Sequence, residues 1–251
     1  MHLPVSARLL AAATVLFGLT AAAGAGETAD RPRAVIEFFT SQGCSSCPPA
    51  DEVVAEFAAR PDVVALAYHV DYWDYLGWRD TLASAENTAR QYDYSEALGQ
   101  RSVYTPQAVV NGSAHVNGAD RAGVDAALAA TPAATVEIDI RRAGDSIVIE
   151  AGGAEAEPAE AHVLLVYFDS AVEVEIGRGE NGGRTIAYHN AVRAFHSAGM
   201  WRGRPERFEM PAGEMMKKAT GGCAAILQEV TESGHPGAVL GAAVLRWDAG
   251  S

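Results

Sequence analysis

Two cysteines set between an apolar strand and an apparent helix constrain this chain more than any other feature. Cys44 and Cys47 follow the run AVIEFF, which suits a buried strand, and precede ADEVVAEFAAR, whose apolar residues recur at helical spacing. Proline is tolerated only in the first turn of a helix, so Pro48 and Pro49 predict a helix that begins near Ser46 or Cys47. The pair is a redox couple, half of a metal site or a structural disulfide, and the rest of the chain bears on that choice.

The first 25 residues have the pattern of an export signal and are set aside from the fold. Arg8 supplies a basic start, the run from Leu9 to Leu19 is apolar, and Ala23 to Ala25 form a small-x-small cleavage pattern. The apolar run is too short to span a bilayer. The protein is therefore expected to be periplasmic or secreted, with no membrane insertion after the signal is removed.

The charge of the remaining chain argues against two classes of partner. Without Arg8, 18 basic residues (19 − 1) stand against 32 acidic ones, which gives a net charge of −14. Such a field repels nucleic acid and anionic lipid, and no basic cluster offsets it. We therefore expect neither nucleic acid nor a lipid surface as a partner.

The number of cysteines weakens the structural reading of the pair. Three cysteines leave one over after a pair forms, and Cys223, within an apolar strand, is expected to be a buried free thiol. In an oxidising compartment Cys44 and Cys47 can rest as a disulfide, but the loop between them is too small to stabilise the fold mainly through chain entropy.

Strands and helices alternate between Ala34 and Ala130. The predicted order is strand, helix, strand, helix, strand, strand, helix. QAVVNGSAHVNG is predicted to form a hairpin with Asn111-Gly112, or a neighbouring pair, at its turn. The expected strands are AVIEFF, DVVALAYHV and the two arms of that hairpin, and the expected helices are ADEVVAEFAAR, LASAENTARQYDYSEALG and ADRAGVDAALAA.

The pattern changes after Thr131-Pro132. Segments such as TVEIDI, SIVIEA and AHVLLVYFD alternate or run apolar at strand length, separated by Gly, Asp and Pro. Several short strands at this spacing are typical of a small β-sandwich. GRGENGG lacks the context of a phosphate-binding loop and is predicted to be a turn. The expected organisation is a signal at residues 1–25, an α/β domain at 32–131 and a β-rich, sandwich-like domain at 133–250.

The position of the cysteines favours redox chemistry. A thiolate is the attacking species in disulfide exchange, and the unpaired N–H groups at a helix N-terminus lower the pKa of a nearby thiol. Cys44 is expected to attack and Cys47 to resolve the mixed disulfide. The dithiol carries the two electrons, so no cofactor is needed. The expected partners are a protein thiol or disulfide substrate and an unidentified redox partner.

A second signal lies in YTPQAVVNG, where Thr105-Pro106 directly precedes a strand. Together with Cys44 and Cys47, in this order, the segment resembles a thioredoxin-like domain. That resemblance implies a cis bond at Thr105-Pro106, beside the cysteines, and a role for Thr105 and Pro106 in holding a bound peptide. The alternative is an ordinary trans proline that opens a strand.

Longer strings resemble a narrower family. EFFTSQGCSSCPPAD, HVDYWDYLGW, YTPQAVVNG and GRGENGGRTIAYHNAVR together resemble the secreted bacterial proteins grouped as domain of unknown function 1223. The resemblance spans nearly the whole chain after the signal. It implies a thioredoxin-like domain followed by a β-rich domain, and it implies no particular activity.

Four further residues are candidates for proton transfer or for a substrate groove. Glu37 precedes Cys44 by seven residues, where thioredoxins place a buried acid six residues ahead, so it is either a proton acceptor for Cys47 or one half of an ion pair. His69, Asp71 and Trp73 follow the second strand. Parallel strands end at one edge of a sheet, so these side chains line a groove beside the cysteines or form a packed aromatic corner.

Two other classes of function remain open. Cys44, Cys47 and His69 supply soft ligands that suit copper or zinc, although a second Cys-x-x-Cys and a paired histidine motif are missing, so no metal site is assigned. The other class is a non-catalytic binding protein whose disulfide shapes a surface loop. The sequence does not separate an oxidant from a reductant or an isomerase.

Overall fold

The computed structural model describes residues 32–154, 160–213 and 219–247. The export signal expected at residues 1–25 lies outside these ranges. None of the helices within them is long and apolar enough to cross a membrane.

Helices make up a small part of the described chain. The helices are α1 (Pro48–Ala58), the 3-10 helix η1 (Asp74–Leu76), α2 (Ala85–Ala97) and α3 (Arg121–Ala130). The first strands are β1 (Ala34–Thr40), β2 (Val63–His69), β3 (Gln107–Val110), β4 (Ala114–Asn117), β5 (Ile138–Ala143) and β6 (Ser146–Ala151). The later strands are β7 (Ala161–Glu175), β8 (Thr185–Trp201), β9 (Glu206–Pro211), β10 (Gly222–Val230) and β11 (Pro236–Arg246).

The predicted order of elements between Ala34 and Ala130 is confirmed, with η1 in addition. The turn between β3 and β4 has positive φ angles at Asn111 and Gly112, as expected of the tight hairpin that an Asn-Gly pair forms. The local signals in this part of the sequence therefore place the elements correctly.

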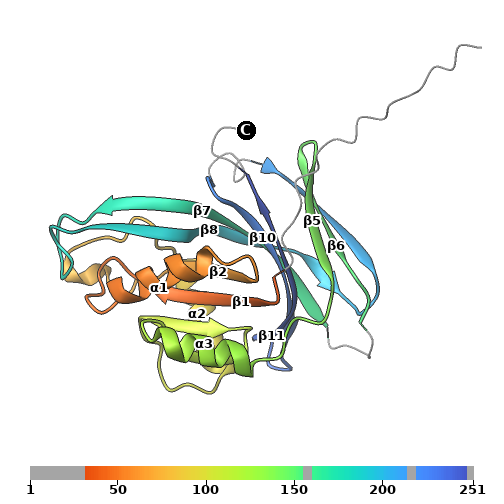
Figure 1. Ribbon diagram of the computed structural model, residues 1–251, viewed down its shortest axis with the longest axis horizontal. Coiled ribbons are helices and arrows are strands. Elements are labelled where there is room, and N and C mark those ends of the chain that lie inside the picture. The colour runs from red at the N-terminus through yellow and green to blue at the C-terminus, as the bar shows by residue number, and fades with distance from the viewer. Residues whose placement is uncertain (1–31, 155–159, 214–218, 248–251) are drawn as a thin grey trace, which may run out of the picture.

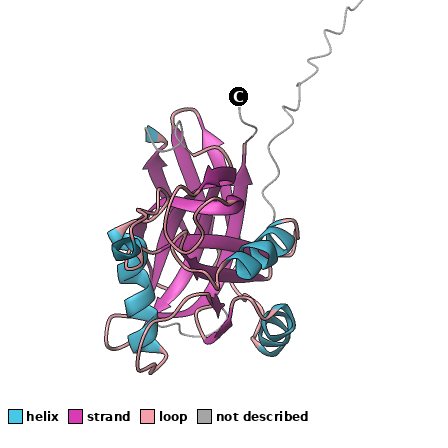
Figure 2. Cartoon of the chain, turned by 90° about the vertical axis from the view of Figure 1, so that its left-hand side faces the viewer, coloured by secondary structure: helices cyan, strands magenta, loops and turns pink. Residues whose placement is uncertain are grey.

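The predicted fold class is wrong. We expected an α/β thioredoxin-like domain followed by a separate β-rich, sandwich-like domain, but the protein is mostly β and its main sheet continues through both segments (Figures 1 and 2). The eight strands of this sheet are ordered β11-β10-β7-β8-β2-β1-β3-β4, and β5-β6-β9 form a second sheet of three strands.

The junction between β2 and β8 makes the main sheet continuous. Ala67 pairs with Ala191 in parallel orientation, and the side-chain amide of Asn190 donates a hydrogen bond of 2.8 Å to the carbonyl of Ala65. Asn190 has a positive φ angle, which an asparagine adopts more readily than most residues. Strand periodicity shows which residues are buried but not which strands pair, so it did not predict this junction.

Helices cover both faces of the sheet around β1. Residues Ile36 and Phe38 pack against α1 and α3 on one face, whereas Val35 and Phe39 pack toward Tyr94 of α2 on the other. The three-stranded sheet packs on strands β7, β10 and β11, at the end of the molecule away from α1 (Figure 1). Parallel strands β1 and β2 thus end side by side, with Thr40 opposite His69, directly before the cysteine loop.

Candidate functional site

The two cysteines form a disulfide at the start of α1. Cys44 and Cys47 are bonded, with their Cα atoms 5.4 Å apart, and Cys223 is a buried free cysteine, as expected. The loop turns tightly, because the Cys44 amide donates to the carbonyl of Ser41 and the Cys47 amide donates to that of Cys44. Cys47 is the residue that precedes the first turn of α1, so the helix begins where the two prolines predicted it.

The turn between β7 and β8 covers this disulfide. We call residues 177–184 the hairpin tip; Figure 1 shows the long β7–β8 hairpin running alongside β1 and β2 to the end at which α1 begins. The Asn181 amide in the tip donates to the carbonyls of Gln42 (3.0 Å) and Cys44 (2.9 Å). Both cysteines are 0 % exposed. The sequence predicted only a turn here and gave Asn181 no role.

A layer of buried polar side chains lies between the strand ends and α1. The Thr40 hydroxyl donates to Asp51 of α1 over 2.8 Å. His69 of β2 bonds through Nδ1 to Asp80, also over 2.8 Å, and the same Asp80 oxygen accepts from the backbone amide of Gln42. We call Thr40, Asp51, His69, Asp80 and Tyr188 the polar layer, because Tyr188 of β8 completes it with its ring 4.7 Å from that of His69.

Three atoms of the polar layer have no hydrogen-bond partner within the described protein. They are Asp51 Oδ2, His69 Nε2 and the hydroxyl of Tyr188. Burial raises the pKa of Asp51 to about 7, although His69 and the hydrogen bond from Thr40 act in the opposite direction. Burial also opposes the charging of His69, but Asp80 outweighs it and the pKa of His69 is raised. The pKa values of Asp51 and His69 are therefore both raised above their ordinary values, one by burial and the other by its acidic partner.

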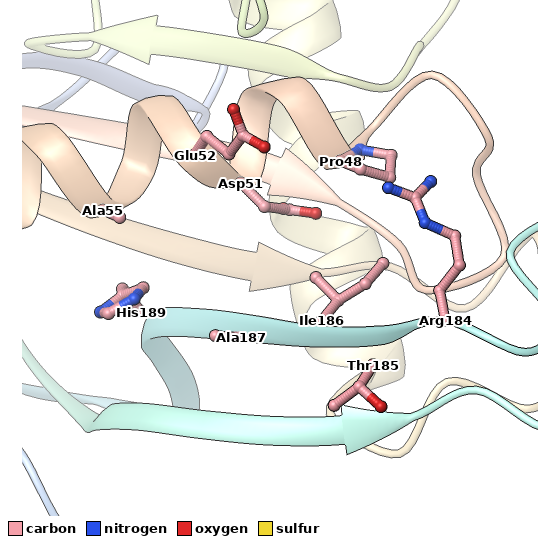
Figure 3. A pocket seen from close by; sticks show the side chains of 9 residues that line it. All are labelled: Pro48, Asp51, Glu52, Ala55, Arg184, Thr185, Ile186, Ala187 and His189. Atoms are coloured by element: carbon pink, nitrogen blue, oxygen red, sulfur yellow. The ribbon is translucent and has the colours of Figure 1, made fainter.

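A pocket of about 250 Å³ opens beside the polar layer, between α1 and β8. Figure 3 shows Asp51 on the side of α1 that faces β8, whereas the Glu52 carboxylate points away from that strand. Arg184, at the start of β8, reaches toward Pro48 across the pocket. The pocket gives solvent an approach to the first turns of α1.

The Thr105-Pro106 loop lies on another side of the cysteine loop. The peptide bond between Thr105 and Pro106 is cis, as the resemblance implied. Trp73 joins the two loops, because its indole N–H donates to the Thr105 hydroxyl over 2.8 Å and its Cβ lies against Gly43. A Cβ atom on Gly43 would lie 3.0 Å from that of Trp73, which explains why glycine fits this position.

Glu37 and Asp71 are engaged elsewhere. Glu37 lies on the α2 side of β1, where it accepts hydrogen bonds from Arg90 and from the hydroxyl of Tyr94. Asp71 accepts a hydrogen bond of 2.7 Å from Thr88 of α2. The structure therefore brings His69 and Trp73 to the surroundings of the disulfide but directs Glu37 and Asp71 toward α2.

Sequence reasoning missed Asp51, Asp80, Tyr188 and Asn181. For Asp51, the spacing of four residues from Cys47 was an available signal. Within the described ranges, no group of three or more His, Cys, Asp or Glu side chains is arranged to hold a metal ion. His69, which we considered as a metal ligand, is bonded to Asp80 instead.

Together these features define a class of protein: a mostly β chain with a buried Cys-x-x-Cys disulfide where two parallel strands end. The chain belongs to the family described as protein of unknown function (DUF1223), which it matches over residues 35–228. The family resemblance drawn from the four sequence strings is thereby confirmed. These comparisons do not support the wider resemblance to thioredoxin-like proteins.

Two solved structures are similar to this one. A crystal structure of a protein from Agrobacterium tumefaciens is 42% identical, with a TM-score of 0.77, and the match covers 85% of this chain and 94% of that one. HBP35 of Porphyromonas gingivalis is 11% identical, with a TM-score of 0.56, and the match covers 84% and 74% of the two chains, which shows similarity of fold alone. No curated protein matches the chain.

Proposed function

We propose that this protein exchanges disulfides with protein thiols through Cys44 and Cys47. The observation that carries the proposal is the disulfide itself, closed at the end of two parallel strands and at the start of α1. A thiolate of the partner attacks Cys44 Sγ, the bond between the cysteine sulfurs breaks, and Cys47 leaves with the electron pair. A second partner thiolate then displaces Cys44, so the partner gains a disulfide and this protein gains two thiols.

The proposal extends to the surroundings of the disulfide. Thr105 and Pro106 are the residues proposed to contact the peptide, because Trp73 ties their loop to the cysteine loop. The proposed compartment is the periplasm or the exterior of the cell, where a resting disulfide persists. The proposed partners are a protein thiol or disulfide and a further redox protein, and the net charge of −13 argues against nucleic acid.

Exchange requires the hairpin tip to move. Both cysteines are 0 % exposed, and a thiolate cannot approach a sulfur that packed atoms surround. Asn181 holds the tip against the cysteine loop through two carbonyl groups, and Glu180 accepts from the amide of Ser45. We propose that these few bonds break when a partner binds.

A second candidate function is a non-catalytic binding protein with a structural disulfide. The burial of both cysteines favours it, because catalytic cysteines are usually partly exposed. In that case the disulfide would fix the loop that Asn181 and Trp73 contact, and reduction would disturb binding without any transfer of electrons.

The reduction potential of the pair separates the two candidates. We expect a value in the range of exchange proteins, about −120 to −270 mV, when the protein is equilibrated with glutathione; a value below about −300 mV is typical of structural disulfides. We also expect Cys44 of the variant Cys47→Ser to attack a disulfide of an oxidised, unfolded model protein and to remain joined to it as a mixed disulfide, with release of one model-protein thiol. The matched control is Cys223→Ser, which removes the buried free thiol and should leave the potential unchanged. A low potential together with no mixed disulfide would overturn the redox proposal.

A further inference from the structure

The polar layer contains the main group of buried polar atoms that lack partners in the described protein. Asp51 Oδ2, His69 Nε2 and the Tyr188 hydroxyl come from α1, β2 and β8, and all three residues are at most 5 % exposed. Buried polar groups in native proteins are nearly always hydrogen-bonded, so unsatisfied groups that share one place need an explanation. Proton transfer is one such explanation, because an atom that gives or takes a proton lacks a hydrogen-bond partner in one of its two protonation states.

Asp51 is placed toward the disulfide by helix geometry. It follows Cys47 by four residues, and its backbone amide donates to the Cys47 carbonyl over 3.1 Å. Residues four apart lie on the same face of a helix, and helical side chains lean toward the N-terminus. Asp51 therefore lies on the same face of α1 as Cys47, and both residues are buried there.

The groups around Asp51 influence whether its carboxyl group carries a proton. His69 carries the bond to Asp80 on Nδ1, so its Nε2 remains available toward the layer. Burial raises the pKa of Asp51 to about 7, whereas an ordinary aspartate is fully ionised there. The titratable, charged or hydrogen-bonding groups that face Asp51 or its pocket from the packed elements are Thr40, Glu52, His69, Asp80, Arg184, Tyr188 and His189.

We propose that Asp51 transfers the proton of Cys47 during disulfide exchange, with Thr40 positioning its carboxyl group and the pocket between α1 and β8 connecting it to water. This inference rests on the proposed function. When the disulfide opens, the Asp51 carboxylic acid gives its proton to the departing Cys47 thiolate and becomes a carboxylate. When the pair closes, the carboxylate takes the proton back from the Cys47 thiol, and the resulting thiolate attacks the mixed disulfide at Cys44 and releases the partner thiolate.

The pocket provides both the proton route and a matched control. Asp51 and Glu52 are neighbours on α1 and both line the pocket, but Asp51 is buried and Glu52 is exposed. Loss of the charge at Glu52 changes the field at the pocket without touching the polar layer. The variants Asp51→Asn and Glu52→Gln both remove one carboxyl group from the pocket, but only Asp51→Asn removes the exchangeable proton inside the polar layer, so Glu52→Gln is the matched control.

The test measures how fast dithiothreitol reduces the disulfide as a function of pH, with each rate divided by the thiolate concentration. We expect the corrected rate of the unmodified protein to fall above pH 7, where Asp51 loses its proton. In Asp51→Asn that inflection should disappear, and the rate below pH 7 should drop by about tenfold or more, as for loss of a general acid. Glu52→Gln should keep the inflection.

A second measurement needs no variant. Isotope-edited NMR of the aspartate carboxyl groups follows Asp51 in the oxidised and the reduced protein, and we expect its titration to shift upon reduction, because a Cys47 thiolate disfavours a second negative charge nearby. An Asp51 titration that is the same in both forms, or an inflection that persists in Asp51→Asn, would overturn the proposal. If dithiothreitol gives the expected pH profiles but no protein thiol exchanges with the disulfide, the proposed function fails and proton transfer by Asp51 stands. If protein thiols exchange but the rate shows no inflection near pH 7, the proposed function stands and proton transfer by Asp51 fails.

Discussion

Two buried acidic clusters lie on opposite faces of β1, and they are built in different ways. On the α2 side, Glu37 accepts from Arg90 and Tyr94, and Gln228 of β10 bonds to both of those residues, so both oxygens of the Glu37 carboxylate have partners. On the α1 side, the polar layer leaves one oxygen of Asp51 without a partner. A satisfied buried ion pair fixes a structure, whereas an acid with a free oxygen can change its protonation state at little structural cost.

The difference also assigns roles to the two acids. Glu37 is the acid that sequence comparison with thioredoxins suggested, yet it binds a guanidinium on the face of the sheet that α1 does not cover. Asp51 stands on the helix that the cysteines precede. We therefore expect substitutions at the Glu37 cluster to change stability, and substitutions in the polar layer to change the response to pH.

The largest expected effect is the loss of Arg90. Arg90→Met leaves the Glu37 carboxylate buried without a cation, which should lower the free energy of unfolding by about 3–5 kcal/mol. Urea unfolding at neutral pH measures the loss. The control is Arg121→Met, which removes an ion pair with Glu56 whose two side chains are more than half exposed, so the loss should be much smaller than for Arg90→Met. Equal losses of the free energy of unfolding in the two variants would show that the Glu37 cluster contributes no more to stability than a surface ion pair does.

A smaller effect on the free energy of unfolding, one that depends on pH, is expected from Asp51. Its pKa is raised in the folded protein, so the folded state binds more protons than the unfolded chain between pH 3.8 and about 7, and stability falls as pH rises through that interval. Asp51→Asn should remove this decline and unfold with about 1–3 kcal/mol more stability than the unmodified protein at pH 8. Urea unfolding at a series of pH values measures the free energy of unfolding as a function of pH.

Asp62 supplies a control of opposite sign for the same experiment. The hydrogen bonds from Arg60, and then from Arg33, lower the pKa of Asp62 to about 2, so its contribution is present above pH 3.8 and is lost as pH falls toward 2. The Asp62 side chain is 42 % exposed, and Asp62→Asn should therefore change stability only slightly and leave the interval between pH 4 and 7 unaffected. A flat curve for the unmodified protein in that interval would contradict the role of Asp51.

Asn181 is expected to affect access to the disulfide, because its side chain joins the hairpin tip to the cysteine loop. Asn181→Ala removes two hydrogen bonds between the hairpin tip and the cysteine loop, so glutathione should reduce the disulfide about tenfold faster. Asn117→Ala, at an exposed asparagine with a local bond, should leave that rate unchanged. A rate that does not respond to Asn181→Ala would mean that the tip is not the barrier to the disulfide.

The parts of the fold that sequence predicted are those with local signals. The two prolines predicted the start of α1, and Asn111-Gly112 or a neighbouring pair was expected at the β3–β4 turn. The cis bond at Thr105-Pro106 was implied by the resemblance to thioredoxin-like domains and not by a local signal. The pairing of β2 with β8 was out of reach because it joins segments far apart in the chain, and strand patterns carry no information about partners.

The candidate site divides in the same way. Cys44, Cys47 and Trp73 were found from spacing and from their place after a strand. Asp80, Tyr188 and Asn181 reach the site from a loop and from a distant hairpin, so their contribution depends on the sheet junction that the sequence did not reveal. For Glu37 the sequence left a proton acceptor and an ion pair as alternatives, and the structure has the ion pair with Arg90. A shift of one residue along a strand places a side chain on the other face of the sheet.

The contact between Ala67 and Ala191 has a consequence for how the chain acquires its structure. These residues are 124 positions apart (191 − 67), so the middle of the main sheet closes only after most of the chain is available. Contacts of long sequence separation slow folding, because the entropy of closing the loop is lost before the contact forms. We expect the edge of β2 to stay unpaired during folding until β8 forms. A chain truncated before Ala191 should therefore associate with other copies through that edge.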